Sequence, residues 1–259
     1  MKKSVFFSLL LVSGMSFAQE LFPQGENSPK EDTLKGSDTQ FRNFWDVKKY
    51  ELSVEANFDK KSVSGTNIIS FEITKDIKNP VFQIDLQQPM QFEFINKDKN
   101  LTAKRDKDFI FINKKKSYKK GEKLNFTFKY WGNPTIAIRA PWDGGWVFDR
   151  DEKGNPWISV AQEGNGVSHW LPVKDIWSDE PDNGILMKII TPKNLSGIGN
   201  GKLISKKTEK GKNIFTWEVK NAINPYSIVP TIGKLVNFKD SYNGEIGKLD
   251  LDYWVLEDN

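Results

Sequence analysis

The sequence predicts an all-β protein of mostly antiparallel strands with little helix. Three observations support this fold class. Apolar and polar residues alternate in many short segments, which is the period of a half-buried strand. Turns rich in Gly, Asn and Lys separate these segments, as at 120–121, 153–156 and 210–212. No long window has the apolar 3.6-residue period of a capped helix, so we expect packed sheets or a curved open sheet.

The first 18 residues have the features of a secretory signal peptide. Lys2 and Lys3 provide a basic start, an apolar run extends from Val5 to Val12, and small residues lead to Ala18. The run is too short to span a bilayer. We expect cleavage after Ala18, no membrane span afterwards, and an exported protein in the periplasm or outside the cell.

The rest of the chain is expected to be a leader followed by one domain. Residues 19–43 are polar, rich in Gly, Pro, Ser and charge, and show neither the helical nor the strand period, which is typical of a flexible leader. Beyond them we find no internal repeat and no Pro- or Ser-rich linker. A single β domain is therefore predicted over residues 44–259.

The strands can be predicted in order. The first has one apolar side, formed by Tyr50, Leu52, Val54, Ala56 and Phe58. The second places on one side Val63, Gly65, Asn67, Ile69, Phe71 and Ile73, and the polar turn at 59–61 makes a hairpin of the two. Further strands are predicted at 90–94, 109–112, 124–130, 215–219 and 249–255.

The composition restricts the chemistry of the chain. It contains no cysteine and a single histidine, His169, so nucleophilic cysteine and zinc sites built on several histidines are excluded within it. His169 is expected to be a packed or hydrogen-bonded structural residue. The net charge of +4 is spread along the chain, which argues against a nucleic-acid partner.

Two groups of residues need a choice between structural and functional roles. The densest acidic stretch contains Asp175, Asp179, Glu180 and Asp182. Paired carboxylates can hydrolyse glycosides, but charge clusters usually stay in water, and we expect solvated loop acids here. The segment from Ala140 to Trp177 holds five Trp, which we expect to fill a core or an interface rather than bind sugars.

Several segments carry a family resemblance, namely 46–54 (DVKKYELSV), 63–67 (VSGTN), 140–145 (APWDGG), 178–182 (SDEPD), 196–203 (SGIGNGKL) and 251–256 (LDYWVL). Together they span nearly the whole chain after the leader. They resemble the N-terminal domain of the aminopeptidase N family of zinc metallopeptidases. The resemblance implies a large, saddle-shaped, sandwich-like β domain whose concave side covers the active-site cleft of a catalytic zinc domain.

The resemblance also implies a substrate contact. In the family, a Gln or Glu located nine residues before a Pro binds the free α-amino group of the substrate. That position is Glu163 here, nine residues before Pro172, and Gln162 is the weaker second candidate. A carboxylate suits this role because it pairs with an ammonium group and holds a peptide in register.

The family's catalytic motifs, G-x-M-E-N and H-E-x-x-H, do not occur in this sequence, which stops close to where the catalytic domain would begin. We therefore expect no catalytic residue, no metal ligand and no cofactor in this chain, which alone should be no enzyme. Zinc would belong to a missing or separate catalytic domain. The expected partner is that zinc-peptidase domain or a peptide substrate.

Two other functions remain open. The first is a stand-alone secreted β module that binds a protein or peptide. A large exposed apolar patch would favour either this function or a missing domain that covers the patch. The second is a hydrolase that uses paired carboxylates, such as Asp179 and Glu180.

Overall fold

The computed structural model describes residues 30–96, 98, 101–114 and 116–257. The predicted signal peptide and residues 19–29 of the predicted leader lie outside this part. The chain divides into two units, Met1–Ser37 and Asp38–Asn259, and each is described by itself. In the first, the structure shows one short helix, α2 (Lys30–Gly36), where the leader was expected to be irregular.

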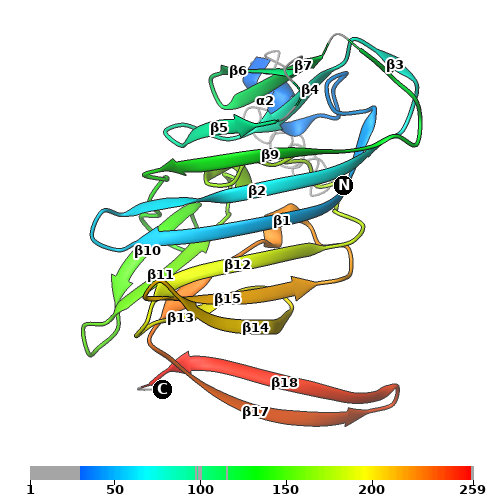
Figure 1. The fold of residues 1–259 in the computed structure, drawn as a ribbon. Coiled ribbons are helices and arrows are strands. Elements are labelled where there is room, and N and C mark those ends of the chain that lie inside the picture. Colours follow the sequence, from blue (N-terminus) through cyan, green and yellow to red (C-terminus); the bar gives the residue numbers. More distant parts are fainter. Residues whose placement is uncertain (1–29, 97, 99–100, 115, 258–259) are drawn as a thin grey trace, which may run out of the picture. The chain divides into compact units, whose positions relative to one another are not determined.

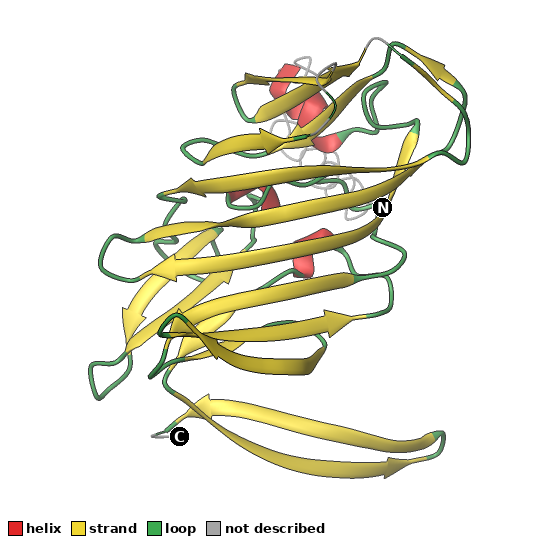
Figure 2. Ribbon diagram, viewed as in Figure 1, coloured by secondary structure: helices red, strands yellow, loops and turns green. Residues whose placement is uncertain are grey.

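The regular secondary structure of the second unit is almost entirely β, with strands in open sheets joined by turns and loops (Figures 1 and 2). The largest sheet contains, in spatial order, β14 (Lys202–Glu209), β15 (Lys212–Val219), β12 (Ile185–Pro192), β1 (Trp45–Asn57), β2 (Ser62–Ile73), β9 (Lys123–Gly132) and β5 (Gln91–Ile95). A four-stranded sheet contains β10 (Gly145–Arg150), β11 (Pro156–Ala161), β16 (Thr231–Gly233) and β13 (Ser196–Ile198).

Three smaller groups complete the strand inventory. They are a three-stranded sheet of β4 (Val81–Asp85), β7 (Phe109–Lys114) and β6 (Leu101–Asp106), a pair of β3 (Ile77–Lys78) and β8 (Ser117–Tyr118), and a hairpin of β17 (Leu235–Gly244) and β18 (Gly247–Leu256). Two 3-10 turns, η1 (Val167–His169) and η2 (Pro225–Ser227), lie in connections. The predicted all-β fold class is confirmed.

The first hairpin forms as its alternation predicts. Tyr50, Leu52 and Val54 are buried, and β1 pairs with β2 from Trp45 opposite Ile73 to Asn57 opposite Ser62. The strand pairs are antiparallel with one exception, because β1 pairs in parallel with β12 on its other edge. β1 is therefore an interior strand of the large sheet.

The core is organised around aromatic rings that join the sheets. Phe71 of β2 and Phe126 of β9 lie 4.7 Å apart, and both contact Phe82 of β4. Farther along, Trp170 contacts Tyr130 of β9 and Trp146 of β10 at 6.2 and 5.4 Å. Aromatic contacts thus join the large sheet to the three-stranded sheet through Phe82 and to the four-stranded sheet through Trp146. Aromatic pairs in edge or offset geometry add stability beyond that of the apolar area they bury.

Residues 167–176, which we call the buried segment, are buried without interruption. Val173 exchanges two backbone hydrogen bonds with Asp85 at 2.7 and 3.1 Å. The Pro172 carbonyl accepts from Asn67 Nδ2 of β2 at 2.9 Å. These hydrogen bonds join the buried segment to β4 of the three-stranded sheet and to β2 of the large sheet. They also restrain the positions where the neighbouring residues enter and leave the segment.

Two residues at the end of the predicted leader make contacts within the second unit. Residues 19–43 were expected to be a flexible leader, but Arg42 is fully buried and forms an ion pair with Asp85. The Phe41 carbonyl accepts from Trp45 Nε1 at 3.0 Å. The sequence does not reveal this ion pair, because the partner of Arg42 lies 43 positions away and leaves no local pattern.

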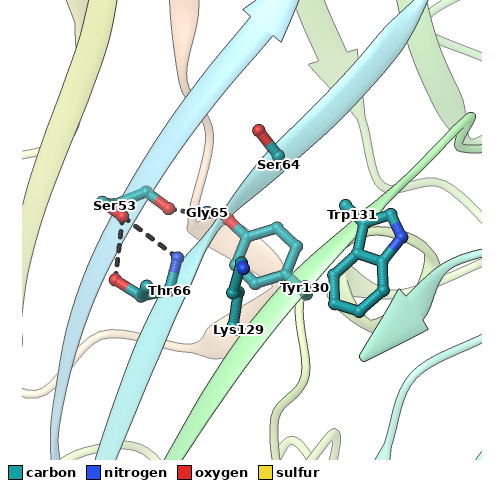
Figure 3. A pocket seen from close by; sticks show the side chains of 7 residues that line it. All are labelled: Ser53, Ser64, Gly65, Thr66, Lys129, Tyr130 and Trp131. Atoms are coloured by element: carbon teal, nitrogen blue, oxygen red, sulfur yellow. Dashed lines mark hydrogen bonds between the residues drawn. The ribbon is translucent and has the colours of Figure 1, made fainter. Parts of the chain in front are cut away.

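Gly65 occupies a crowded position in the large sheet. It lies between Ser53 of β1 and Tyr130 of β9, whose hydroxyl donates to the Ser53 carbonyl at 2.9 Å (Figure 3). A Cβ atom at Gly65 would collide with the Ser53 carbonyl and the Tyr130 hydroxyl. The glycine allows Tyr130 to reach across β2 and tie β9 to β1.

We predict that Gly65→Ala destabilises the domain by about 1–3 kcal/mol, because the sheet backbone must shift to admit the methyl group. Urea unfolding of the variant and the parent protein measures the difference. Ser64→Ala, at the adjacent exposed position, is the matched control and should stay within about 0.5 kcal/mol. Equal stability of the two variants would contradict the crowding described here.

Candidate functional site

Glu163 lies on a rigid turn that follows β11. The amides of Asn165 and Gly166 donate to the Gln162 carbonyl at 3.1 and 2.9 Å. Gly166 has a φ of +71°, and a Cβ there would lie 2.5 Å from the Asp175 carboxylate. The turn therefore requires glycine at this position. Glu163 itself is exposed, and its carboxylate accepts a hydrogen bond from the Tyr226 hydroxyl at 2.7 Å.

The electrostatic surroundings leave the Glu163 carboxylate able to take a cation. Among the described residues, Glu163 forms no ion pair, and its hydrogen-bonding partner is the neutral phenol of Tyr226. The hydrogen bond to this carboxylate raises the pKa of Tyr226, because the negative charge disfavours a phenolate beside it. An exposed carboxylate oriented by a phenol is suited to bind an ammonium group.

Gln162, the second predicted contact residue, is buried instead of facing solvent. Its Nε2 donates to the Ile228 carbonyl at 3.0 Å, and its Oε1 lies 3.0 Å from His169 Nε2. Both ends of the side chain thus bind groups within the domain, and Gln162 joins the turn to the segment around η2. His169 is fully buried, which confirms its predicted structural role.

Sequence reasoning missed two aromatic neighbours of Glu163. The Tyr226 ring meets the indole of Trp177 edge-on at 5.7 Å, and Trp177 is 68% exposed. Asn224 joins the pair, since its Oδ1 accepts from the Tyr226 amide at 3.0 Å and its Nδ2 donates to the Trp177 carbonyl at 3.4 Å. The Asn224-Pro225 dipeptide signals a turn, but the sequence does not show what that turn faces.

A loop on another side of the turn carries further exposed apolar residues. The Asp143 carboxylate accepts from the amides of Ile138 and Arg139, both at 2.7 Å, which closes the loop. Asn165 Nδ2 donates to the Gly144 carbonyl at 2.8 Å and fastens the loop to the Glu163 turn. Ile138 and Trp142 are 88% and 82% exposed, so the loop that is fastened to the Glu163 turn carries exposed apolar side chains.

The five Trp of this region divide between core and surface. Trp146 and Trp170 are fully buried, in agreement with the expected core role, Trp157 is half-buried, and Trp142 and Trp177 are exposed. A hollow of about 540 Å³ lies between the loop and β10–β11, with Ile136, Phe148 and Trp157 among its lining residues. A second, shallow hollow of about 420 Å³ lies over Ser64, Thr66 and Trp131 (Figure 3).

The expectation of solvated loop acids was wrong for two of the four residues. Asp175 is buried and accepts from the Ser168 amide at 3.0 Å. Asp179 is buried, pairs with Lys174, and accepts from the Val47 amide at 3.0 Å. Glu180 and Asp182 are exposed as expected. Burial of Asp175 and Asp179 is possible because each carboxylate accepts hydrogen bonds from amide or ammonium groups that are also buried.

The β17–β18 hairpin presents another exposed apolar surface. It pairs with no other strand of the described chain. One of its contacts with the remainder is that of Trp254, which lies 6.1 Å from Trp217. Its exposed apolar side chains are Val236, Phe238, Tyr242, Ile246, Leu249 and Tyr253. Two-stranded sheets are marginally stable alone, and exposed patches of this kind mark interaction sites.

The described residues contain neither a cluster of metal-ligating side chains nor a helix that could span a membrane. No group of three or more Asp, Glu or His side chains there is arranged to hold a metal ion. The described residues therefore do not fit a zinc centre, and we assign no zinc-dependent step to them. No helix in the same part of the chain combines the length and the apolar character that crossing a membrane requires.

Comparison with known proteins shows what the fold is similar to. No protein-family model and no curated protein matches the sequence. The structure is similar to an M1 zinc metallopeptidase of Deinococcus radiodurans, at a TM-score of 0.62 and 14% identity over 85% of this chain. A mutant of the Deinococcus radiodurans enzyme bound to a Tyr-Ser-Ala substrate gives 0.67 and 15% over 86%. A two-domain M1 zinc metallopeptidase mutant bound to L-tryptophan gives 0.66 and 14% over 85%.

The extent of the match is as informative as its score. This chain spans 49–50% of the length of these three structures. At such low identity the likeness shows a shared fold alone. The fold is that of one part of an M1 zinc metallopeptidase, consistent with an N-terminal domain, and the resemblance noted in the sequence is confirmed at this level.

The Lys174–Asp179 pair provides a test of the site's framework. We predict that Asp179→Asn lowers stability by about 3–5 kcal/mol, because the buried Lys174 ammonium loses its counter-charge. Chemical denaturation measures this loss. Glu180→Gln, an exposed acid one residue away, should change stability by less than about 0.5 kcal/mol. Similar effects of the two substitutions would restore the solvated role for Asp179.

Proposed function

We propose that this chain is the non-catalytic N-terminal domain of an exported, aminopeptidase N-like zinc metallopeptidase. In this role it covers the active-site cleft of a zinc-containing catalytic domain, and Glu163 binds the α-amino group of the peptide substrate. The observation that carries the proposal is the match of most of this chain to half of several M1 zinc metallopeptidases.

The contacts of Glu163 support the anchoring role. Its carboxylate is exposed on a turn closed by two backbone hydrogen bonds to the Gln162 carbonyl, and it accepts a hydrogen bond from the Tyr226 hydroxyl. A charged acceptor held in one place gives a bound ammonium a defined position without the entropy loss of ordering a mobile side chain. Gln162 supports the same site by holding the turn through its buried hydrogen bonds.

The partner proposed is the catalytic zinc domain, which this chain does not include. The exposed apolar side chains of the β17–β18 hairpin and of the Ile138–Trp142 region support a covered surface. The same observation favours a second candidate function, a stand-alone secreted module that binds a protein or peptide. A hydrolase based on paired carboxylates has less support, because Asp179 already neutralises Lys174.

The purified chain alone tests the non-catalytic assignment. We predict no stoichiometric zinc by metal analysis and no release of amino acids from aminoacyl-anilide substrates. The expected result follows from the lack of a ligand cluster in the described residues. Tightly bound zinc together with turnover that Glu163→Gln abolishes would overturn the assignment.

The anchoring role can be tested with matched ligands. We predict that L-phenylalaninamide, protonated at about pH 6, binds the chain with a Kd in the millimolar range, as followed by NMR titration. N-acetyl-L-phenylalaninamide, which lacks the ammonium group, should bind far more weakly. Glu163→Gln should weaken binding of the free amine by about 10–100-fold, the effect of losing a hydrogen bond to a charged group.

Glu180→Gln is the control for that titration, because it removes an exposed acid of the same sign elsewhere and should leave affinity unchanged. If both amides bind equally well to the parent chain, or if Glu163→Gln binds the free amine as tightly as the parent, Glu163 does not anchor an ammonium group.

A further inference from the structure

The surroundings of Glu163 contain a residue whose exposure has no structural explanation. Trp177 directly follows the buried segment, yet its side chain is 68% exposed. A large aromatic side chain that faces water forgoes the stabilisation that burial would provide. Its position is nevertheless fixed, because its carbonyl accepts from Asn224 and its ring packs edge-on against Tyr226.

Three segments distant in sequence converge to build this arrangement. Glu163 comes from the turn after β11, Trp177 directly follows the buried segment, and Tyr226 belongs to η2. Two side-chain hydrogen bonds join the segments. Gln162 Nε2 donates to the Ile228 carbonyl in a buried bond, and Asn224 Nδ2 donates to the Trp177 carbonyl at 3.4 Å in an exposed one. A carboxylate, a phenol and an exposed indole are thereby kept adjacent.

This combination matches the chemistry of an amino-terminal residue that has an apolar side chain. The ammonium group pairs with the Glu163 carboxylate, and the side chain attached to the neighbouring carbon needs an apolar surface close by. The Tyr226 ring links the two, since its hydroxyl contacts Glu163 at 2.7 Å and its ring lies 5.7 Å from that of Trp177. Aromatic rings gain most from such edge or offset contacts.

We propose that Trp177 is a specificity-determining residue that contacts the side chain of the first residue of a bound peptide and favours an aromatic one. Tyr226 acts as a positioning residue, which holds the Glu163 carboxylate and supports the Trp177 ring. The inference rests on the proposed function, because it takes Glu163 as the ammonium site. It adds to that function a preferred substrate class.

The test compares L-phenylalaninamide with L-alaninamide, which share the ammonium group and differ in the side chain. By NMR titration of the whole chain at about pH 6, we expect the parent to prefer the phenyl compound by about three- to tenfold. Trp177→Ala should reduce this ratio to near one, while binding still requires the free amine. Trp131→Ala is the control, because it removes a partly exposed Trp that lines the second, shallow hollow (Figure 3), and it should leave the ratio unchanged.

The positioning role of Tyr226 has its own readouts. Tyr226→Phe should weaken binding of both amides by a similar factor and leave their ratio intact. Glu163→Gln should lower the pKa of Tyr226, followed by NMR of ring-labelled tyrosine, because the neighbouring negative charge is removed.

The outcomes separate the two proposals. If binding depends on the amine and on Glu163 but Trp177→Ala keeps the parental ratio, the role of Trp177 is refuted and the anchoring function stands. If neither the amine nor Glu163 matters, the anchoring function fails, and the inference that builds on it fails with it. Since Trp177 is mostly exposed, its replacement should not unfold the domain, and a thermal melt of the variant checks this.

Discussion

The rest of the domain depends on the ion pair and hydrogen bonds of one buried carboxylate, that of Asp85. It pairs with Arg42, accepts from the Asp175 amide at 2.9 Å and accepts from Gln83 Nε2 at 2.8 Å. An isolated charge in an apolar interior is very unfavourable, so all three donors must be in place for the core to close. Through Asp175 this requirement extends to the buried segment, and the Glu163 turn and Trp177 stand at its two ends.

The strands that were predicted from the sequence have a local signal. The alternation of Tyr50, Leu52 and Val54 reflects a sheet with one face against a core, and it is readable wherever that condition holds. Burial of charge is not local in the same way. Lys174 donates a hydrogen bond to the carbonyl of Trp45, 129 positions away. The residues next to Lys174 in the sequence do not indicate that contact. The acids of this region were therefore assigned to solvent by a rule that their distant partners override.

The candidate site shows the same division. Glu163 was identified through a family resemblance, and the structure places it on an exposed turn where its assigned role stays a prediction. Gln162 was read from adjacency in sequence, whereas in space it points inward to His169. Tyr226 and Trp177 were missed because 63 and 14 residues, respectively, separate them from Glu163, and only the folded chain brings the three together.

The parallel pairing of β1 with β12 also has a consequence for how the chain assembles. β2 follows β1 directly, so one edge of β1 can be satisfied early by a local hairpin. Its opposite edge, from Tyr50 to Glu55, must wait for residues 185–190. Contacts of such long range are slow to form, and an unpaired strand edge is a template for wrong partners in the meantime. Wrong strand pairing is thus the main risk while the protein folds, because the incomplete sheet exposes an edge of β1, the strand that later lies at its centre.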